Sequence, residues 1–281
     1  MFLYELVNLY KYNNEHIIKM NNSCICLICH KPNNIYLDFL KTFTSYDIVV
    51  VIDDFSINYY NDEYYQKEYP NFVFVQLDNV NCMENGFQMA NLALNKMVSG
   101  WDKAIYFFSF YYKEYDYIWY IEDDIFFYNE NVFQNIDMKY PDSDLLVKQI
   151  DQRDDEKWLW SAVINHLPEP HYNSLVCVCR VSKQLLSYIY DYVKKYKQLI
   201  FIEILFTSVA KANNLKCDCP YELVPVIYRY DWNVNNVNKL QLFHPIKDLN
   251  LQTEMREALR KEIDLKGRMF YLKEHFIPVK I

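Results

Sequence analysis

Three acidic residues in a row follow a short apolar segment near the middle of the chain. The segment is YIWYI at residues 117–121, and Glu122, Asp123 and Asp124 come directly after it, before apolar residues resume. Adjacent carboxylates repel one another and resist burial, so they need either solvent or a cation. A hard divalent ion binds carboxylate oxygens and shares its other coordination positions with phosphates. The pattern favours a metal site, and an exposed acidic turn stays open as the alternative.

The elements that must position these acids alternate between apolar runs and helical patterns. We expect strands at residues 23–30, 47–53, 72–77 and 117–121, with helices at 33–44 and 84–98 between them. Nearly continuous apolar strands separated by helices are typical of an α/β fold with a parallel sheet covered on both faces. Ligands of such sheets lie beyond the carboxyl ends of the strands, and a second acidic pair, Asp53 and Asp54, falls at such an end.

The second half of the chain has a mixed pattern. We expect further strands at 145–150, 174–181, 221–230 and 239–243, and helices at 182–196, 201–214 and 252–266. Residues 151–173 and 231–238 are polar loops. The length of 281 residues suits one globular domain. We divide it into an N-terminal helical extension (1–20), a main domain (21–250) and a C-terminal helix and tail (251–281).

Composition excludes several classes of protein. Hydrophobic residues make up 52% of the chain and charged residues 23%, so the chain is not disordered. The formal charge of -8 shows no basic excess, so we expect no nucleic-acid partner. Only three glycines are present, which excludes GxGxxG and Walker-type phosphate loops. No signal peptide and no run of 18 apolar residues is visible, so we expect no membrane span.

Eight cysteines raise the question of a zinc site or of buried thiols. Only Cys26 and Cys29 have CxxC spacing, whereas a zinc ribbon needs two such pairs. Cys24 and Cys26, like Cys177 and Cys179, alternate inside apolar strands. This pattern favours structural thiols in a reducing, intracellular setting. We therefore expect a cytoplasmic protein.

Three segments together carry a resemblance to a known family. Glu122-Asp-Asp after an apolar strand resembles the DxD motif of GT-A glycosyltransferases, of the nucleotide-diphospho-sugar transferase superfamily. Residues 101–107 (WDKAIYF) are similar to a segment of giant-virus and algal members, and residues 243–247 (FHPIK) resemble the HPxK segment near the end of the GT-A domain. The resemblance implies a Rossmann-like, mostly parallel central sheet with helices on both faces. It places the nucleotide-sugar half at 21–128 and the acceptor half at 129–250. A viral source would put the protein in the host cytoplasm or virus factory.

The resemblance also implies a metal and a donor. Mn²⁺ or Mg²⁺ would bridge the diphosphate of a nucleotide-sugar, for which we expect a UDP-sugar in preference to a GDP-sugar. Asp124 is the expected metal ligand, and His244 would complete the site with an imidazole nitrogen, which favours Mn²⁺ over Mg²⁺. Glu122 and Asp123 would contact the donor or support the metal ligands. Lys247 either balances phosphate charge or is a solvated lysine.

The first two strands are expected to hold the nucleotide. By resemblance, His30 at the end of the first strand contacts base or ribose. Asp53 and Asp54 at the end of the second would accept hydrogen bonds from a base N–H or a ribose hydroxyl, or else cap a helix or turn. Gly86 would let the backbone approach the donor.

The expected catalytic base is Glu203, the only charged residue between Gln198 and Lys211. A carboxylate in so apolar a run either faces a cleft or is costly to bury, and desolvation would raise its pKa toward a useful value. An exposed position on a helix is the alternative. Asp154 and Asp155 are the second choice of base. The position of Glu203 resembles that of the base in inverting GT-A enzymes.

Several aromatic and basic residues have two interpretations each. Trp158, Trp160 and Trp232 either bind an acceptor sugar or pack in the core. Arg180 and Arg229 either contact a diphosphate or form structural ion pairs.

Taken together, these features predict a metal-dependent glycosyltransferase of hexosyltransferase type, which transfers a sugar to a hydroxyl group of a glycan, a glycoprotein or a small molecule. The alternatives are a metal-dependent nucleotidyl- or phosphotransferase, against which the missing Gly-rich loop argues, and a non-catalytic sugar-binding protein with the same fold.

Overall fold

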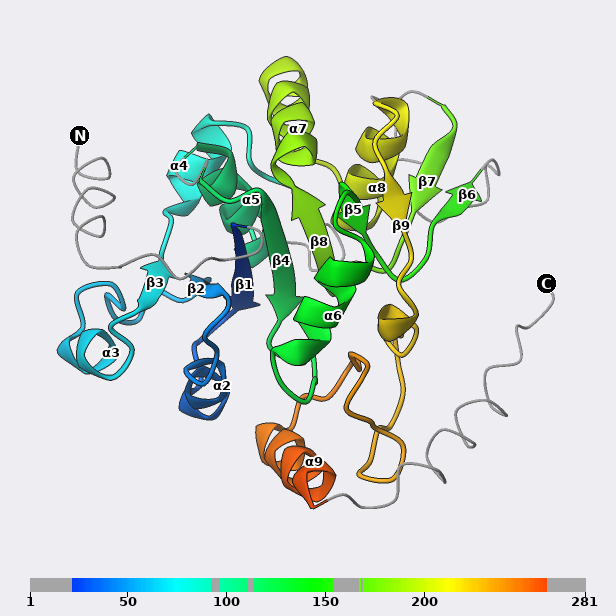
Figure 1. Ribbon diagram of the computed structural model, residues 1–281. Coiled ribbons are helices and arrows are strands. Elements are labelled where there is room, and N and C mark those ends of the chain that lie inside the picture. Colours follow the sequence, from blue (N-terminus) through cyan, green and yellow to red (C-terminus); the bar gives the residue numbers. More distant parts are fainter. Residues whose placement is uncertain (1–21, 92–96, 111–113, 154–166, 168, 262–281) are drawn as a thin grey trace.

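A seven-stranded sheet forms the centre of the computed structural model, which describes residues 22–91, 97–110, 114–153, 167 and 169–261 (Figure 1). The strand order is β3-β2-β1-β4-β8-β5-β9. β8 runs antiparallel to both of its neighbours, β4 and β5, and the other pairs are parallel. The strands are β1 (Ser23–Cys29), β2 (Asp47–Ile52), β3 (Phe72–Val75), β4 (Tyr117–Glu122), β5 (Leu145–Leu146), β8 (Val178–Ser182) and β9 (Cys217–Asp218). β6 (Asp151–Arg153) and β7 (His171–Asn173) form a separate antiparallel pair.

Helices cover both faces of the sheet and bury two large apolar clusters (Figure 1). The first cluster lies under α4 (Asn79–Glu84), α5 (Gly100–Phe110), α7 (Lys183–Tyr196) and α8 (Ile202–Ala212). The second lies under α2 (Asn34–Leu40) and α6 (Asn131–Lys139), and α9 (Leu249–Arg260) packs against α2. The short α3 (Glu63–Glu68) precedes β3, and a 3₁₀ turn, η4, spans Tyr221–Leu223. The predicted α/β class, with a mostly parallel sheet and helices on both faces, is confirmed.

The sequence of the central strands explains their burial. All seven residues of β1 are buried, as are the last five of β2, because each strand has helices above and below it. Polar side chains fix where several helices begin. Asn33 accepts a hydrogen bond from the Ile35 amide before α2, and Ser182 accepts one from Leu185 before α7.

Some predicted boundaries are wrong. No helix forms over the described residues 85–91 of the expected helix 84–98, and residues 92–96 lie outside the described part of the chain. α4 ends at Glu84, because Gly86 takes a positive φ of 81° and turns the chain, and the next described helix on this face is α5. Residues 221–230 form no strand, and residues 239–243 contribute only an isolated bridge between Phe243 and Phe126. Of the expected strand 145–150 only two residues pair, and the expected strand 174–181 begins at Val178 and runs antiparallel.

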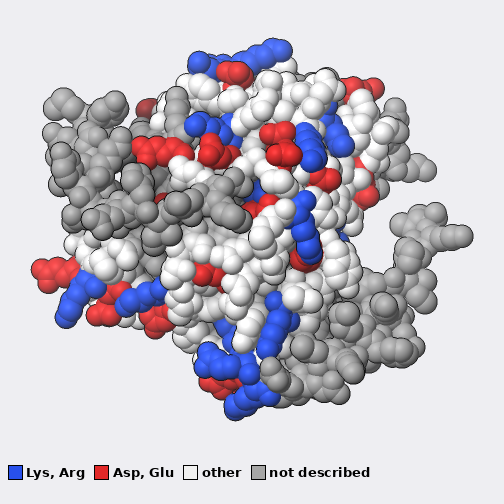
Figure 2. All heavy atoms as spheres, in the orientation of Figure 1, with Lys and Arg blue, Asp and Glu red and all other residues white. Residues whose placement is uncertain are grey.

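On the face drawn in Figure 2, the described Lys and Arg side chains occur in small groups beside Asp and Glu. Within the described ranges, every helix is too short or too polar to span a bilayer. None of the eight cysteines, all within the described residues, forms a disulfide, and six of them are buried.

Candidate functional site

The carboxyl ends of three parallel strands open into one pocket of about 220 Å³. β1, β2 and β4 are neighbours in parallel register, so the residues that follow them meet at the same edge of the sheet. The pocket is lined by Ile28, Cys29, His30, Asp53, Asn91, Ser99, Gly100, Trp101, Glu122, Asp123 and Asp124. Five of the residues singled out in the sequence are therefore gathered around a single cavity.

His244 lies beside Asp124 because two distant segments pair there. Phe126 and Phe243 exchange backbone hydrogen bonds of 2.9 Å, and the Ile246 amide donates to the carbonyl oxygen of Asp124 at 2.8 Å. This pairing holds the chain that carries His244 along the turn after β4. As a result, Nε2 of His244 lies 3.4 Å from Oδ1 of Asp124.

The facing atoms of this pair are suited to a cation. Nδ1 of His244 lies 2.6 Å from the carbonyl oxygen of Ile227, so Nδ1 carries the proton and donates it there, leaving the Nε2 lone pair toward Asp124. Oδ1 of Asp124 is buried and has no hydrogen-bond partner within the described part of the chain. Burial, the largest single influence, lowers the pKa of His244, but Asp124, the Ile227 carbonyl and Glu122 together raise it by more, so the net shift is upward. An orphaned carboxylate oxygen facing an imidazole nitrogen fits an ion such as Mn²⁺.

Glu122 is held between an indole and a thiol. Nε1 of Trp101 donates to Oε1 of Glu122 at 2.8 Å. Because β8 runs antiparallel to β4, Cys177 lies opposite Glu122: the Glu122 amide donates to the Cys177 carbonyl at 3.1 Å. Burial raises the pKa of the Cys177 thiol, and the nearby Glu122 carboxylate raises it further. Burial raises the pKa of Glu122 to about 7, with a further upward contribution from Asp124.

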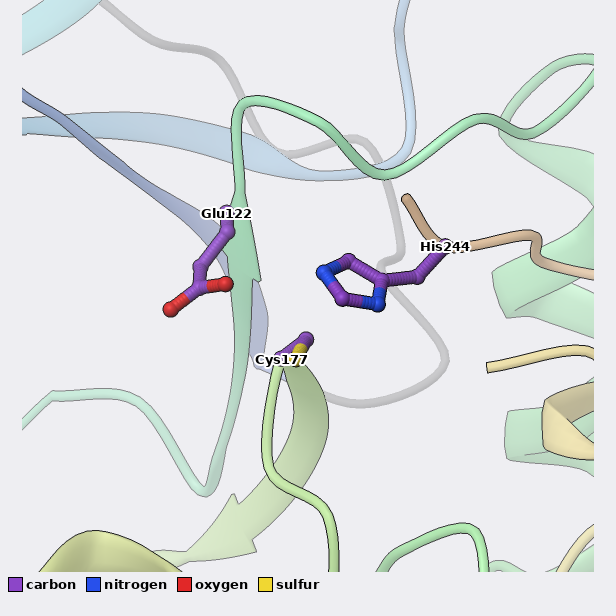
Figure 3. A group of neighbouring side chains, drawn as sticks. All are labelled: Glu122, Cys177 and His244. Carbon is purple, nitrogen blue, oxygen red and sulfur yellow. The ribbon is translucent and has the colours of Figure 1, made fainter. Parts of the chain in front are cut away.

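Glu122, Cys177 and His244 form a compact group of potential metal ligands, drawn in Figure 3. One ligand atom from each lies within 4.8 Å of the other two. The apolar alternation around Cys177 favours a structural thiol, so this contact was not predicted from the sequence. An antiparallel β8 was the missing information, since it alone brings Cys177 to the end of β4.

Asp123 lines the pocket, close to two basic side chains. Burial, and then the neighbouring Asp124, raise the pKa of its carboxyl group to about 6. His30 and Lys247 are close enough to act in the opposite direction. Both predicted basic residues are thus placed near the acid cluster.

The two acids after β2 have different surroundings. Asp53 lines the pocket and pairs with Lys103 at 2.5 Å, and the Lys103 side chain is fully buried. Asp54 lies outside the residues that line the pocket and accepts hydrogen bonds from Ser56 and from Tyr59. These bonds, chiefly that from Ser56, lower the pKa of Asp54 to about 2. Asp54 thus stabilises the loop after β2, in agreement with the alternative that this acid caps a turn and does not contact a nucleotide.

Lys103 was not singled out from the sequence. It lies in the first turns of α5, which begins at the pocket residue Gly100. A Cβ on Gly100 would come within 2.8 Å of the Ile28 side chain, so this glycine lets α5 begin close to β1. Gly86, by contrast, packs against the backbone of Lys197 and is not among the residues that line the pocket.

Glu203 lies in the first turn of α8 and is half-buried among apolar neighbours. Burial alone raises its pKa to about 7. Its carboxylate is close enough to Cys177 to help raise the pKa of that thiol, together with Glu122 and Asp124. Glu203 is not among the pocket-lining residues.

Of the aromatic and basic residues with two interpretations, Trp232 and Arg180 have structural roles, and Arg229 is exposed. Trp232 is 5% exposed and its Nε1 donates to the His244 carbonyl oxygen at 2.9 Å, so its indole packs in the core and supports the His244 segment. Arg180 is buried and pairs with Asp137 at 2.6 Å, while Arg229 is exposed beside the Tyr228 ring. Asp154, Asp155, Trp158 and Trp160 lie outside the described residues.

Helix α9 donates side-chain hydrogen bonds to the two backbone segments that carry the acid cluster and His244. Gln252 donates to the carbonyl oxygen of Ile246 at 2.9 Å, and Arg256 donates to that of Phe127 at 3.2 Å. Arg256 also donates to Oε1 of Gln252 at 2.9 Å, and its guanidinium carbon lies 3.6 Å from the centre of the Phe39 ring. The sequence predicts this helix but not that its buried polar face holds both segments of the site.

No protein-family model matches this chain, and a search of curated proteins found no match. Among solved structures, it is similar to 4-diphosphocytidyl-2C-methyl-D-erythritol synthase from Anaerococcus prevotii, with 11% identity over 85% of this chain and 95% of the other, at a TM-score of 0.43. A second match is core-mannan synthase A from Aspergillus fumigatus in a Mn/GDP form, with 13% identity over 72% of each chain at 0.38. A third is mouse xyloside xylosyltransferase 1, with 11% identity over 70% and 85% at 0.36. These scores lie below 0.5 and assign no activity to this chain.

Proposed function

We propose that this chain is a metal-dependent glycosyltransferase that transfers a sugar from a nucleoside-diphosphate sugar to an acceptor hydroxyl. The observation that carries the proposal is the buried Oδ1 of Asp124, which has no hydrogen-bond partner in the described structure and faces Nε2 of His244 at 3.4 Å. A buried carboxylate oxygen without a hydrogen bond is costly, and a divalent cation between these two atoms would reduce the cost. The pocket of about 220 Å³ at the same strand ends provides room for a ligand.

Asp124 and His244 would hold the ion, with the Ile227 carbonyl fixing the ring and its tautomer. When bound, the ion supplies positive charge for the diphosphate leaving group. His30 and Lys247 add positive or hydrogen-bonding groups close to Asp123. Asp53, held by Lys103, faces the pocket as an acceptor for hydroxyl or N–H groups of the nucleotide. Asp54 is the weaker candidate, since Ser56 and Tyr59 already occupy its carboxylate.

Glu203 is our proposed general base. A general base works best when its pKa lies near the working pH. With a pKa of about 7, the Glu203 carboxylate is basic enough to take the proton of an acceptor hydroxyl, and about half of it is ionised at neutral pH. A carboxylate distinct from the metal ligands suits a single displacement with inversion at the anomeric carbon. The donor half lies within residues 21–128 and the acceptor half within 129–250. We further propose a UDP-sugar donor and a cytoplasmic location.

A binding panel tests the proposal. Melting temperatures are measured with UDP, GDP, CMP or dTDP, each with Mn²⁺, Mg²⁺ or EDTA. UDP with Mn²⁺ is expected to raise the melting temperature by roughly 5 °C at saturating concentrations. Asp124→Asn should abolish the shift, whereas Asp142→Asn, an exposed acid at the opposite edge of the sheet, should keep it. No shift with any nucleotide would refute the proposal.

Products separate glycosyl transfer from nucleotidyl transfer. Incubation with UDP-sugars and mixed acceptors should release UDP, because the bond that breaks joins the sugar to the diphosphate. Release of UMP or pyrophosphate would instead support a nucleotidyl- or phosphotransferase. Binding of the donor with no release at all would support a sugar-binding protein.

A further inference from the structure

Cys177 introduces a sulfur ligand into a site that otherwise contains oxygen and nitrogen. The residue directly precedes β8, is 9% exposed, and lies across the antiparallel β4–β8 pair from Glu122. Figure 3 shows the Cys177, Glu122 and His244 side chains converging from three different segments of the chain. Hard ions such as Mg²⁺ prefer oxygen, whereas thiolate together with imidazole favours Zn²⁺ and Co²⁺.

The spacing of the three ligand atoms is close to that of a zinc site. Zn–S and Zn–N bonds of about 2.3 and 2.1 Å put the ligand atoms of a tetrahedral ion roughly 3.3–3.8 Å apart. The three atoms in this chain lie within 4.8 Å of one another, so side-chain movements of about 1 Å would suffice.

The outer contacts of two ligands also suit a metal. The Ile227 carbonyl accepts a hydrogen bond from Nδ1–H of His244, so that Nε2 is the nitrogen available to a metal. The Trp101 indole holds one carboxylate oxygen of Glu122 at 2.8 Å and leaves the other available. Neighbouring groups that orient the ligands in this way are a usual feature of metal sites.

We propose that Glu122, Cys177 and His244 form a binding site for thiophilic divalent cations, Zn²⁺ in particular, alongside the Asp124–His244 position. As the metal–sulfur bond forms, the thiol proton is released to solvent. Because both positions use Nε2 of His244, a zinc ion here excludes Mn²⁺ from Asp124 and His244. The zinc site itself does not depend on the proposed function, but inhibition of the enzyme by Zn²⁺ does.

Cobalt substitution tests the site directly. Full-length protein titrated with Co²⁺ should develop a sulfur-to-cobalt charge-transfer band in the near ultraviolet. Cys177→Ser should remove the band, while Cys219→Ser, which removes the exposed thiol, should keep it. A band that persists in Cys177→Ser and disappears in Cys219→Ser would overturn the proposal, as would the absence of any band. Circular dichroism establishes that each variant is folded.

Equilibrium dialysis then separates the two metal positions. Cys177→Ser should weaken Zn²⁺ binding at least tenfold, since even the loss of an outer-shell partner costs about 10–100-fold. Asp124→Asn should weaken Mn²⁺ binding by a similar factor and change Zn²⁺ affinity less than threefold. Equal loss of Zn²⁺ affinity in both variants would contradict a separate site. Zinc binding without any Mn²⁺-dependent nucleotide binding would refute the proposed function alone, and the converse would refute only this inference.

Discussion

At the scale of single residues, burial does most to set the chemistry of the site. It raises the pKa values of Glu122 and Glu203 to about 7 and that of Asp123 to about 6. At neutral pH these groups are therefore poised between their protonated and ionised forms, which suits proton transfer and exchange of protons for a cation. His244 differs, because the adjacent Asp124 raises its pKa against the effect of burial.

Glu203→Gln should reduce turnover by about 10²–10⁴-fold, because the amide cannot accept the acceptor's proton. Donor affinity should stay unchanged, since Glu203 lies outside the pocket residues. Initial rates and nucleotide titrations measure the two quantities, and Glu84→Gln, an exposed acid at the end of α4, is the matched control. The wild-type rate should rise with pH around 7 as Glu203 ionises. A variant with full turnover would exclude Glu203 as the base.

Lys103→Met should destabilise the fold, because it leaves the Asp53 carboxylate, with a side chain 12% exposed, without its cation. Breaking a pair of this kind costs about 3–5 kcal/mol. The double change Lys103→Met with Asp53→Asn should recover a large part of that loss. Urea unfolding measures both free energies. If the double variant is no more stable than the single one, the ion pair is not what makes Lys103 important.

At the scale of elements, the site depends on which chain segments the sheet brings together. Parallel β1, β2 and β4 deliver His30, Asp53 and the acid cluster to one edge, and antiparallel β8 delivers Cys177. The segment carrying His244 is fixed by its pairing with Phe126 and by α9 behind it. A tight turn at Gly86 ends α4 and lets the following chain pass beside α7.

Gly86→Ala should lower the free energy of unfolding by about 1–3 kcal/mol, because a side chain is strained at a positive φ. The added Cβ would also lie 2.9 Å from the backbone carbon of Lys197, which cannot move easily. Asn85→Ala changes the adjacent exposed residue at an ordinary φ of -92° and should cost less. Chemical denaturation compares the two variants. Equal effects would show that the turn is not constrained as described.

Much of this architecture could be predicted from the sequence, for identifiable reasons. β1, β2 and β4 are continuous apolar runs ending in polar residues, so their type and their common edge follow from pattern alone. α7 and α8 were predicted within a few residues, because apolar periodicity marks both and Ser182 caps the first.

What could not be predicted depends on pairing between distant segments. The apolar pattern of β8 does not show that the strand runs antiparallel to β4. The proximity of Cys177 to Glu122, which follows from that direction, could therefore not be predicted. Residues 239–243 alternate like a strand, but they make only isolated bridges because their partner is the turn after β4. The role of Lys103 could not be predicted, since a lysine in a helix is ordinarily exposed. This lysine is buried, and its charge is paired with Asp53.

At the scale of the whole molecule, the carboxyl groups with raised pKa values make the folding stability depend on pH and on metal binding. A carboxyl group whose pKa is higher in the folded state holds its proton there after the unfolded chain has released it. Folding stability therefore decreases as pH rises from about 4.5 to 7 for Glu122 and Glu203, and from about 4 to 6 for Asp102 and Asp123. A divalent cation binds the ionised carboxylates and opposes this loss.

In EDTA, the melting temperature should fall between pH 5 and pH 8 through these groups, and Mn²⁺ should restore part of it at pH 8 but little at pH 5. Differential scanning calorimetry at fixed ionic strength measures the profile. Glu122→Gln should flatten the fall, because its amide does not titrate, whereas Glu84→Gln should not. A metal effect that is equal at pH 5 and pH 8 would contradict the linkage.

The most direct measurement is the position of manganese in crystals grown or soaked with Mn²⁺ and UDP. Anomalous scattering collected at the manganese edge locates the ion without reference to the protein. The account predicts a peak roughly 2.0–2.4 Å from both Oδ1 of Asp124 and Nε2 of His244, with diphosphate oxygens completing the coordination. A nucleotide bound in the pocket with no manganese between Asp124 and His244, or manganese bound only elsewhere, would contradict it.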